Sequence, residues 1–322
     1  MSLAHVSHNE IVTFADSKVN LRRDDVKEYR EQVWRLRDKL ETYLNDHPDF
    51  SLKKMMLSGS LAKGTALRTI NDIDVAMYVS AGDAPTSIAD LVQYLAKKLE
   101  TAFPNFSADQ IEPQTYSVKV SFKGSGLDVD IVPILYDGDP QWRGQLVSQE
   151  DGSFLETSIP MHLDFCRSRK SKSPKHFAQN VRLAKFWAKR CKSEIDGFRF
   201  KSFMIELIFA KLADDGVDLA FYPDSLQAFF NYLATSNLAE LIAFTDYYRA
   251  SDVSVVAWQP VKIIDPVNCT NNVSRLYTSQ QANLIVAAAS DAGDAIEWAK
   301  QASGKGETVD AWQDVFGPAF SV

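Results

Sequence analysis

The stretch at residues 57–79, LSGSLAKGTALRTINDIDVAMYV, constrains the fold more than any other part of this sequence. A short apolar run meets the turn Ser58-Gly59-Ser60, a brief segment follows, and Asp72-Ile73-Asp74 opens a second apolar run. Because side chains alternate between the two faces of a strand, Asp72 and Asp74 are expected on one face. Two neighbouring carboxylates on one face repel each other, and burying them without compensating charges is costly. The stretch therefore predicts two strands joined by a turn, with an acidic patch on the second strand.

A bound divalent cation would relieve both penalties. Oxygen-only ligands suit Mg²⁺, which also binds substrate phosphates. The backbone N–H groups of Gly59 and Ser60 stand at an expected helix start, where phosphate is readily bound. Either half alone is commonly structural, since Gly-Ser turns and Asp-x-Asp strand ends are widespread. The joint pattern predicts nucleotidyl transfer, and it resembles the signature of the DNA polymerase β-like nucleotidyltransferase superfamily.

A second acidic pair offers the third carboxylate that such a site needs. An alternating strand at residues 116–122 is followed by a turn and by the apolar strand LDVDIVP at residues 127–133. Asp128 and Asp130 are two residues apart and share one face of this strand, so their spacing does not choose between them. The alternative interpretation is a sheet edge that carries solvated acids.

The composition is that of a globular protein, with 45% hydrophobic and 24% charged residues among 322. The net charge of −7 excludes a general polyanion binder, so any nucleic-acid contact must come from a local patch. No N-terminal apolar segment and no apolar run of about 18 residues is present, so neither secretion nor a membrane span is indicated. The cysteines are three and scattered, which argues against a disulfide framework or a zinc site and is typical of a reducing cytoplasm.

Strands are expected mainly before residue 156, and helices dominate after it. Residues 1–20 lack strong periodicity and are expected to form a tail or a short capping segment, whereas apolar residues recur at helical spacing from about Arg23 to Asn45. We therefore predict an α+β chain in two parts. Residues 1–155 would form a nucleotidyltransferase core with a mixed sheet and an N-terminal spine helix. Residues 156–322 would form a helical lobe that closes the active-site cleft.

A run of ten basic residues without an acid lies between Arg167 and Lys192. A charge run is commonly a solvated face, but phosphates in a cleft would need neutralising from this lobe. Ser202 begins the next expected helix, where its hydroxyl could cap the helix or contact phosphate. The ten basic residues are Arg167, Arg169, Lys170, Lys172, Lys175, Arg182, Lys185, Lys189, Arg190 and Lys192.

Almost the whole chain resembles a bacterial CD-NTase, a cGAS/DncV-like nucleotidyltransferase of CBASS anti-phage systems, and within that family it resembles the clade C (CdnC) type. The resemblance rests on the long N-terminal helix, the motif from Gly59-Ser60 to Asp74 and the LDVDIVP strand. It also rests on the blocks NVRLAKFWAKR, KSFMIEL and IIDPVNCTNN, which resemble segments of the oligoadenylate synthetases as well.

The resemblance implies roles in the first part of the chain. Gly59 and Ser60 would hold the donor triphosphate. Asp72, Asp74 and Asp130 would bind two Mg²⁺ ions, for which Mn²⁺ can substitute. Asp130 is preferred as the third acid because the family pattern places its acid just before the apolar Ile-Val-Pro.

The resemblance also implies roles in the helical part. Lys185 and Ser202 would reach the triphosphate, and Phe203 would stack on a base where relatives often carry tyrosine. Phenylalanine keeps the ring face but loses the hydroxyl, which puts polar base or ribose contacts by this group in doubt.

The implied activity is magnesium-dependent synthesis of a cyclic oligonucleotide from ATP, expected to be a cyclic oligoadenylate, with release of pyrophosphate. The implied partners are a HORMA-domain protein and a Trip13-like regulator, and double-stranded DNA on a basic surface is a further possibility. Two alternatives remain open at this point. One is a linear or tRNA-type nucleotidyltransferase that extends a nucleic acid end, and the other is an inactive module that binds nucleotide or nucleic acid.

Overall fold

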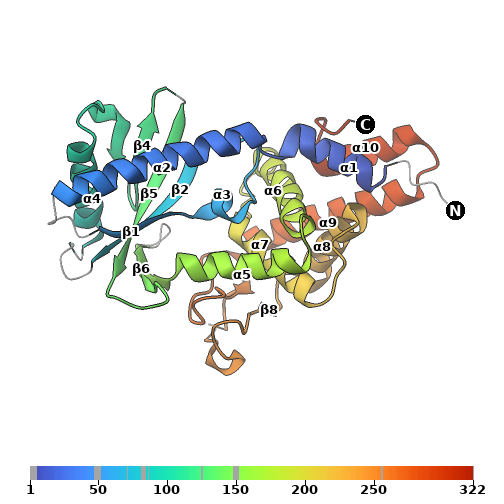
Figure 1. The fold of residues 1–322 in the computed structure, drawn as a ribbon. Helices are drawn as coiled ribbons and strands as arrows, with labels where there is room; N and C mark the ends of the chain where they lie inside the picture. Colours follow the sequence, from blue (N-terminus) through green and yellow to red (C-terminus); the bar gives the residue numbers. More distant parts are fainter. Residues whose placement is uncertain are drawn as a thin grey trace. The chain divides into compact units, whose positions relative to one another are not determined.

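The computed structural model describes residues 6–46, 52–70, 72–80, 85, 87–124, 126–147, 152–254 and 257–321. The chain divides into two compact units, one formed by Leu21–Asp164 and the other by the residues up to Asn20 together with Phe165 onward. The first unit contains a sheet and the second is mainly helical (Figure 1). No helix in the described residues has both the length and the apolar character needed to cross a membrane.

The sheet unit is built on a mixed sheet with strand order β1-β2-β5-β4-β3, to which β6 adds on β5 and β7 on β6. Strands β2 and β5 run parallel at its centre, whereas the other pairs are antiparallel. The expected hairpin before the second acidic strand is confirmed as the pair β4–β5. The strands are β1 (Leu52–Leu57), β2 (Asp72–Ser80), β3 (Ile111–Pro113), β4 (Val118–Phe122), β5 (Leu127–Tyr136), β6 (Gly144–Val147) and β7 (Phe154–Thr157).

One face of this sheet is buried under two helices, α2 (Arg23–Asp46) and α4 (Ile88–Ala102). Alternate residues of β2 and β5, among them Ile73, Val75 and Val129, pack there with leucines of both helices. Because strand side chains alternate, the aspartates that lie between these residues point to the opposite face. Burial of the apolar positions therefore determines the face on which the acidic side chains lie.

The helical unit begins with α1 (His8–Phe14) and the π-helical segment η1 (Ala15–Val19), which pack against α8 and α6 respectively. Of the two expectations for residues 1–20, the tail is therefore wrong for the described residues, because Ile11, Phe14 and Val19 are buried and form a short packed segment instead. The other helices of this unit are α6 (His176–Glu194), α7 (Ser202–Asp214), α8 (Tyr222–Ser236), α9 (Ser279–Gln301) and α10 (Lys305–Phe316), and α5 (Ile159–Lys172) crosses the boundary between the units.

The core of the helical unit is rich in aromatic side chains, and Trp187, Phe209, Phe229 and Phe230 are among its fully buried members. Phe209 and Phe229 stack with ring centroids 4.5 Å apart, and Trp187 meets Phe230 at 4.8 Å. Such pairs add to the free energy gained by burying apolar area. A short parallel pair, β8 (Leu241–Ile242) with β9 (Lys262–Ile263), lies beside this core.

The block IIDPVNCTNN forms a loop held by its own polar side chains. The side-chain oxygen Oδ1 of Asn272 accepts hydrogen bonds from the backbone N–H groups of Ile263 (3.1 Å) and Ser274 (3.0 Å). Asp265 accepts from the N–H of Val267 at 2.8 Å and from the Asn271 side chain at 3.2 Å. These contacts explain why the block carries so many Asn and Asp residues, since Asp265, Asn268 and Asn272 satisfy backbone N–H groups of the loop.

Candidate active site

Gly59 and Asp74 are in direct contact at the start of helix α3 (Gly59–Lys63). The N–H of Ser58 donates to the backbone oxygen of Asp74 at 2.9 Å, which ties the end of β1 to β2. Gly59 has a φ of +59°, and a Cβ added there would overlap the carboxylate of Asp74. Only glycine therefore fits, both for its backbone conformation and for the close approach of the acid. Ser60 follows as the next, half-buried residue of this one-turn helix.

The parallel register of β2 and β5 brings the two acidic pairs together. Asp72 lies opposite Asp128, and Asp74 lies opposite Asp130. All four share the face that α2 and α4 leave uncovered, because the residues between them are in the core. The two Asp-x-Asp segments, which the hairpin and the intervening helix separate in the sequence, thus form one acidic patch.

Asp130 is the most poorly compensated acid of this patch. Its Oδ1 atom is buried and has no hydrogen-bond partner within the described residues. Burial raises the pKa of Asp130 to about 6, and the negative charges of Asp72 and Asp74 add to that rise. A carboxylate that is kept from water and lies among like charges in this way favours an additional positive partner.

Asp128, by contrast, is already paired. Lys119 Nζ lies 2.5 Å from its Oδ2, and the Ser121 hydroxyl donates to its Oδ1 at 2.6 Å. Burial by itself would raise the pKa of Asp128, but these hydrogen bonds outweigh it and lower the pKa below its ordinary value. The two acids that spacing could not separate thus have different surroundings, and those of Asp130 favour it as the open ligand.

Lys119 and Ser121 were not identified as site residues from the sequence. Their signal was the alternation of β4, which puts both side chains on the face that the hairpin shares with the acids. The antiparallel register pairs Lys119 with Asp130 and Ser121 with Asp128. A cation opposite the second acidic strand is visible only once that register is known.

A divalent cation fits the donor atoms of this patch, although the side chains do not yet enclose one. Within the described residues, no group of three or more His, Cys, Asp or Glu side chains is arranged so that it could hold a metal ion. The unpartnered Oδ1 of Asp130 and the repulsion among its neighbours are nevertheless the conditions that such an ion relieves. Carboxylate oxygens are the ligands that Mg²⁺ prefers.

Lys185, Ser202 and Phe203 belong to the helical unit, which is described here by itself. Lys185 on α6 is 6% exposed and lies 3.5 Å from Glu206 on α7, itself 4% exposed. Ser202 is the first residue of α7 and is exposed, and the N-cap position belongs to Lys201, which makes no side-chain cap. Phe203 is half-buried, so its ring is not part of the closed core. The capping role considered for Ser202 is therefore wrong, and its exposed hydroxyl can meet a ligand.

The basic run is not a uniformly available surface. Arg169 is 5% exposed and donates to Asp214 at 2.6 Å and to Asp246 at 2.5 Å. Its guanidinium also lies 3.9 Å from the ring centre of Phe165. The expectation that this arginine is available to a polyanion is wrong, because it serves the packing of α5 against α7. Exposed positions of the run remain at Arg167, Lys172, Lys175, Lys189 and Lys192.

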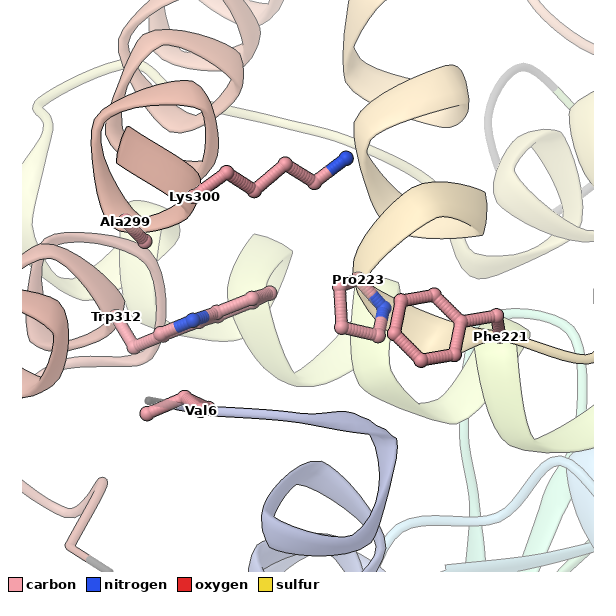
Figure 2. A pocket seen from close by; sticks show the side chains of 6 residues that line it. All are labelled: Val6, Phe221, Pro223, Ala299, Lys300 and Trp312. Atoms are coloured by element: carbon pink, nitrogen blue, oxygen red, sulfur yellow. The ribbon is translucent and has the colours of Figure 1, made fainter. Parts of the chain in front are cut away.

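A small apolar pocket in the helical unit is unrelated to this chemistry (Figure 2). Its volume of about 30 Å³ is about that of one water molecule. The ammonium of Lys300 donates to Asp224 and Gln227. The pocket is lined by Val6, Phe221, Pro223, Ala299, Lys300 and Trp312, and it is too small for a nucleotide.

Comparison with known proteins gives matches to a family and to individual relatives. Residues 6–168 match the family described as Second Messenger Oligonucleotide or Dinucleotide Synthetase domain, SMODS. The chain is 61% identical over 320 residues to Cyclic AMP-AMP-AMP synthase of Escherichia coli strain MS 115-1, covering 99% of both. It is 34% identical over 322 residues to CBASS oligonucleotide cyclase CdnC of Escherichia coli strain KTE188, covering 98% of both.

Two solved structures are also very similar to this chain. The structure of Escherichia coli MS115-1 CdnC with ATP superposes with a TM-score of 0.95 and is 61% identical, over 99% of this chain and 100% of that one. The complex of that CdnC with HORMA-deltaN superposes with a TM-score of 0.94 and is 60% identical, over 99% of each chain.

Proposed function

Because this chain belongs to the second messenger oligonucleotide or dinucleotide synthetase family, it is a nucleotidyltransferase that makes a cyclic oligonucleotide, and we propose cyclic AMP-AMP-AMP, made from ATP, as the product. The expected resemblance to clade C CD-NTases of CBASS anti-phage systems is confirmed, as is the polymerase β-like α+β fold. The observation that carries the choice of product is the 61% identity, over 99% of both chains, to a cyclic AMP-AMP-AMP synthase.

The sheet unit would supply the reacting centre. Gly59 and Ser60 would hold the donor triphosphate through the backbone at the start of α3, and the contact between Gly59 and Asp74 supports this because it brings that backbone to an acid. Members of this family use divalent metal ions. In this chain Asp72, Asp74 and Asp130 would hold two Mg²⁺ ions, with Mn²⁺ able to replace them.

The chain's own residues would then carry the proton and the phosphates. Bound metal would lower the pKa of the attacking ribose hydroxyl and stabilise the pyrophosphate leaving group. Asp130 would accept the hydroxyl proton as the ribose oxygen bonds to the α-phosphorus and the bond to pyrophosphate breaks. A dication held beside Asp130 would keep this carboxylate ionised, which supports its assignment as the proton acceptor.

The helical unit would bind the rest of the nucleotide and close the cleft. Lys185 and Ser202 would contact the triphosphate, and Phe203 would stack on a base. The exposure of Ser202 and the half-exposed ring of Phe203 support these roles. The pairing of Lys185 with Glu206 implies that phosphate competes with a carboxylate already in place for the lysine. The functional division at residues 155 and 156 is part of this proposal.

Partners are proposed from the relatives and from surface charge. A HORMA-domain protein is proposed because the relative CdnC was solved in complex with HORMA-deltaN, and a Trip13-like regulator is proposed from the family resemblance. Double-stranded DNA would bind to exposed cations such as Arg167, Lys172 and Lys175, with binding that weakens steeply as salt rises. We also propose the cytoplasm as the location, where ATP is available.

The proposal is tested by incubating the chain with mixed NTPs and Mg²⁺ and identifying the product by mass spectrometry. The expected product is cyclic AMP-AMP-AMP that resists phosphatase, and Asp72→Asn/Asp74→Asn should make none. Linear, phosphatase-sensitive chains would indicate the alternative of a polymerising nucleotidyltransferase. Absence of pyrophosphate release, both alone and with the HORMA-domain partner, would indicate an inactive binding module.

A further inference from the structure

The β4 strand holds both oxygens of Asp128. Lys119 Nζ is 2.5 Å from Oδ2, and Ser121 Oγ is 2.6 Å from Oδ1. The register between β4 and β5 places Ser121 opposite Asp128 and Lys119 opposite Asp130. Lys119 is therefore bonded to one acid of the pair while it lies across from the other.

The surroundings of Lys119 differ from those of an ordinary surface cation. Its side chain is 28% exposed and that of Asp128 is 25% exposed, so solvent screens the pair only in part. The charges of Asp128, Asp72 and Asp130 all stabilise its ammonium. With Asp74 beside Asp130, four carboxylates share this face with one lysine bonded among them.

We infer that Lys119 is the built-in counter-ion of the acidic patch, which holds Asp128 aside and competes electrostatically with the divalent cation for Asp72, Asp74 and Asp130. This inference rests on the metal-binding role proposed for those three aspartates. A fixed positive charge at this distance weakens cation binding, and the same charge relieves carboxylate repulsion when no cation is bound. Lys119 is thus a positioning residue, since it acts through Asp128 and through its charge.

The positive charge of Lys119 within the acidic patch has a chemical use. Without Lys119, only the Ser121 hydroxyl would hold Asp128, which could then turn into the patch as a fourth acidic ligand, and the cation would be held more tightly than three carboxylates require. Tighter retention of the cation would slow the departure of pyrophosphate, which would leave with cation bound to it. The lysine would keep cation binding weak enough for release.

The test measures Mn²⁺ binding to the full chain without nucleotide, by titration calorimetry at low ionic strength, together with the melting temperature in a chelator. Lys119→Met removes the charge and keeps the apolar stem, whereas Lys119→Gln also keeps a hydrogen-bond donor for Asp128. Lys123→Met is the matched control, because Lys123 follows the same strand but pairs with Asp109 at 3.0 Å and is 59% exposed.

Both Lys119 variants should bind Mn²⁺ about three- to tenfold more tightly than the wild type, the effect of removing one nearby charge. Both should also melt at a lower temperature in chelator, by about 2–4 °C. Lys123→Met should change neither value. The double variant Lys119→Met/Asp128→Asn restores the net charge of the patch and should bind Mn²⁺ within about twofold of the wild type.

Unchanged or weaker Mn²⁺ binding in both Lys119 variants overturns the inference, as does tight binding that persists in the double variant. Asp130→Asn separates this failure from a failure of the proposed site. If Mn²⁺ binding of the wild type survives Asp130→Asn, the metal site is wrong and the counter-ion falls with it. If Asp130→Asn removes the binding while the Lys119 variants match the wild type, only the counter-ion is wrong.

Discussion

Arg169 and Asp130 are two charged side chains withdrawn from water, one in each compact unit, and they are treated in opposite ways. Arg169 donates to Asp214 and Asp246 at 2.5–3.2 Å and stacks on Phe165. Burial by itself would lower the pKa of Arg169. The hydrogen bonds to the two aspartates outweigh that effect and raise the pKa above its ordinary value. Asp130 has a buried oxygen without a hydrogen-bond partner among the described residues. Burial and the like charges of Asp72, Asp74 and Asp128 raise its pKa to about 6.

The contrast separates charges that serve the fold from charges that await a ligand. A buried ion costs several kcal/mol unless hydrogen bonds and counter-charges offset the loss of water. The helical unit supplies that compensation for Arg169 entirely from within itself. In the sheet unit, Asp128 is compensated by Lys119 and Ser121, whereas Asp130, two residues away, is not compensated in this way. Of the two acids on β5, Asp130 is therefore the one whose charge is incompletely compensated, which points to binding from outside the chain.

The largest expected effect comes from breaking the uncompensated side of this comparison. Asp130→Asn should lower the rate of cyclic product formation by about 10³-fold or more, since it removes a ligand and a base together. Its melting temperature in chelator should stay level or rise, because repulsion is relieved. Asp128→Asn is the matched control and should lose far less activity. Product formation is measured by mass spectrometry, and stability by thermal melts. If Asp128→Asn lost more activity than Asp130→Asn, Asp128 would be the third ligand.

Removing the compensated charge, Arg169, should affect the stability of the fold and not the rate of product formation. Arg169→Met should lower the free energy of unfolding by about 3 kcal/mol, because Asp214 and Asp246 lose the buried guanidinium that they share and only the exposed Lys172, 3.3 Å from Asp214, remains. Arg167→Met, on the exposed side of the same helix, should change it by less than about 0.5 kcal/mol. Denaturant unfolding monitored by circular dichroism gives both values. Equal, small losses in the two variants would show that Arg169 is solvated like its neighbour.

Lys185 sharpens the comparison, because it is compensated by Glu206 and is also proposed to bind phosphate. Lys185→Met should raise the KM for ATP and also destabilise the fold, by about 2–3 kcal/mol, since the buried Glu206 loses the positive charge of Lys185. Lys185→Met/Glu206→Gln should recover most of that stability without recovering ATP affinity. Recovery of both would mean that Lys185 acts only through the fold.

The smallest effect is a pH dependence of stability without metal. Because the folded chain raises the pKa of Asp130 from 3.8 to about 6, it binds more protons than the unfolded chain between those values. Stability should therefore fall as pH rises from about 4 to about 6 and level off above, by about 1–2 kcal/mol after allowance for solvent screening. Unfolding in chelator across this range, wild type against Asp130→Asn, isolates this contribution. Identical slopes would show that the pKa of Asp130 is not raised.

The sequence by itself determined that β2 carries acids on one face and apolar residues on the other. The alternation of Asp72 and Asp74 with Ile73 and Val75 and the turn at Gly59 are short-range patterns. They correctly predicted that Ile73 and Val75 enter the core and that the two acids share the other face. Helical spacing likewise predicted α2 to within a residue of its observed end. Local patterns carry this information because strand and helix periods act between residues a few positions apart.

The tertiary structure alone decided which charges are compensated. Asp128 and Asp130 are equivalent by spacing, and they differ only because β4 presents Lys119 and Ser121 in one register. In the sequence Arg169 belongs to a basic run. Only the tertiary structure brings Asp214 and Asp246, 45 and 77 residues further on, into contact with it. The residues before Asn20 showed little periodicity, yet they pack into α6 and α8. Neutralisation and burial depend on partners brought from distant parts of the chain, and no local pattern contains them.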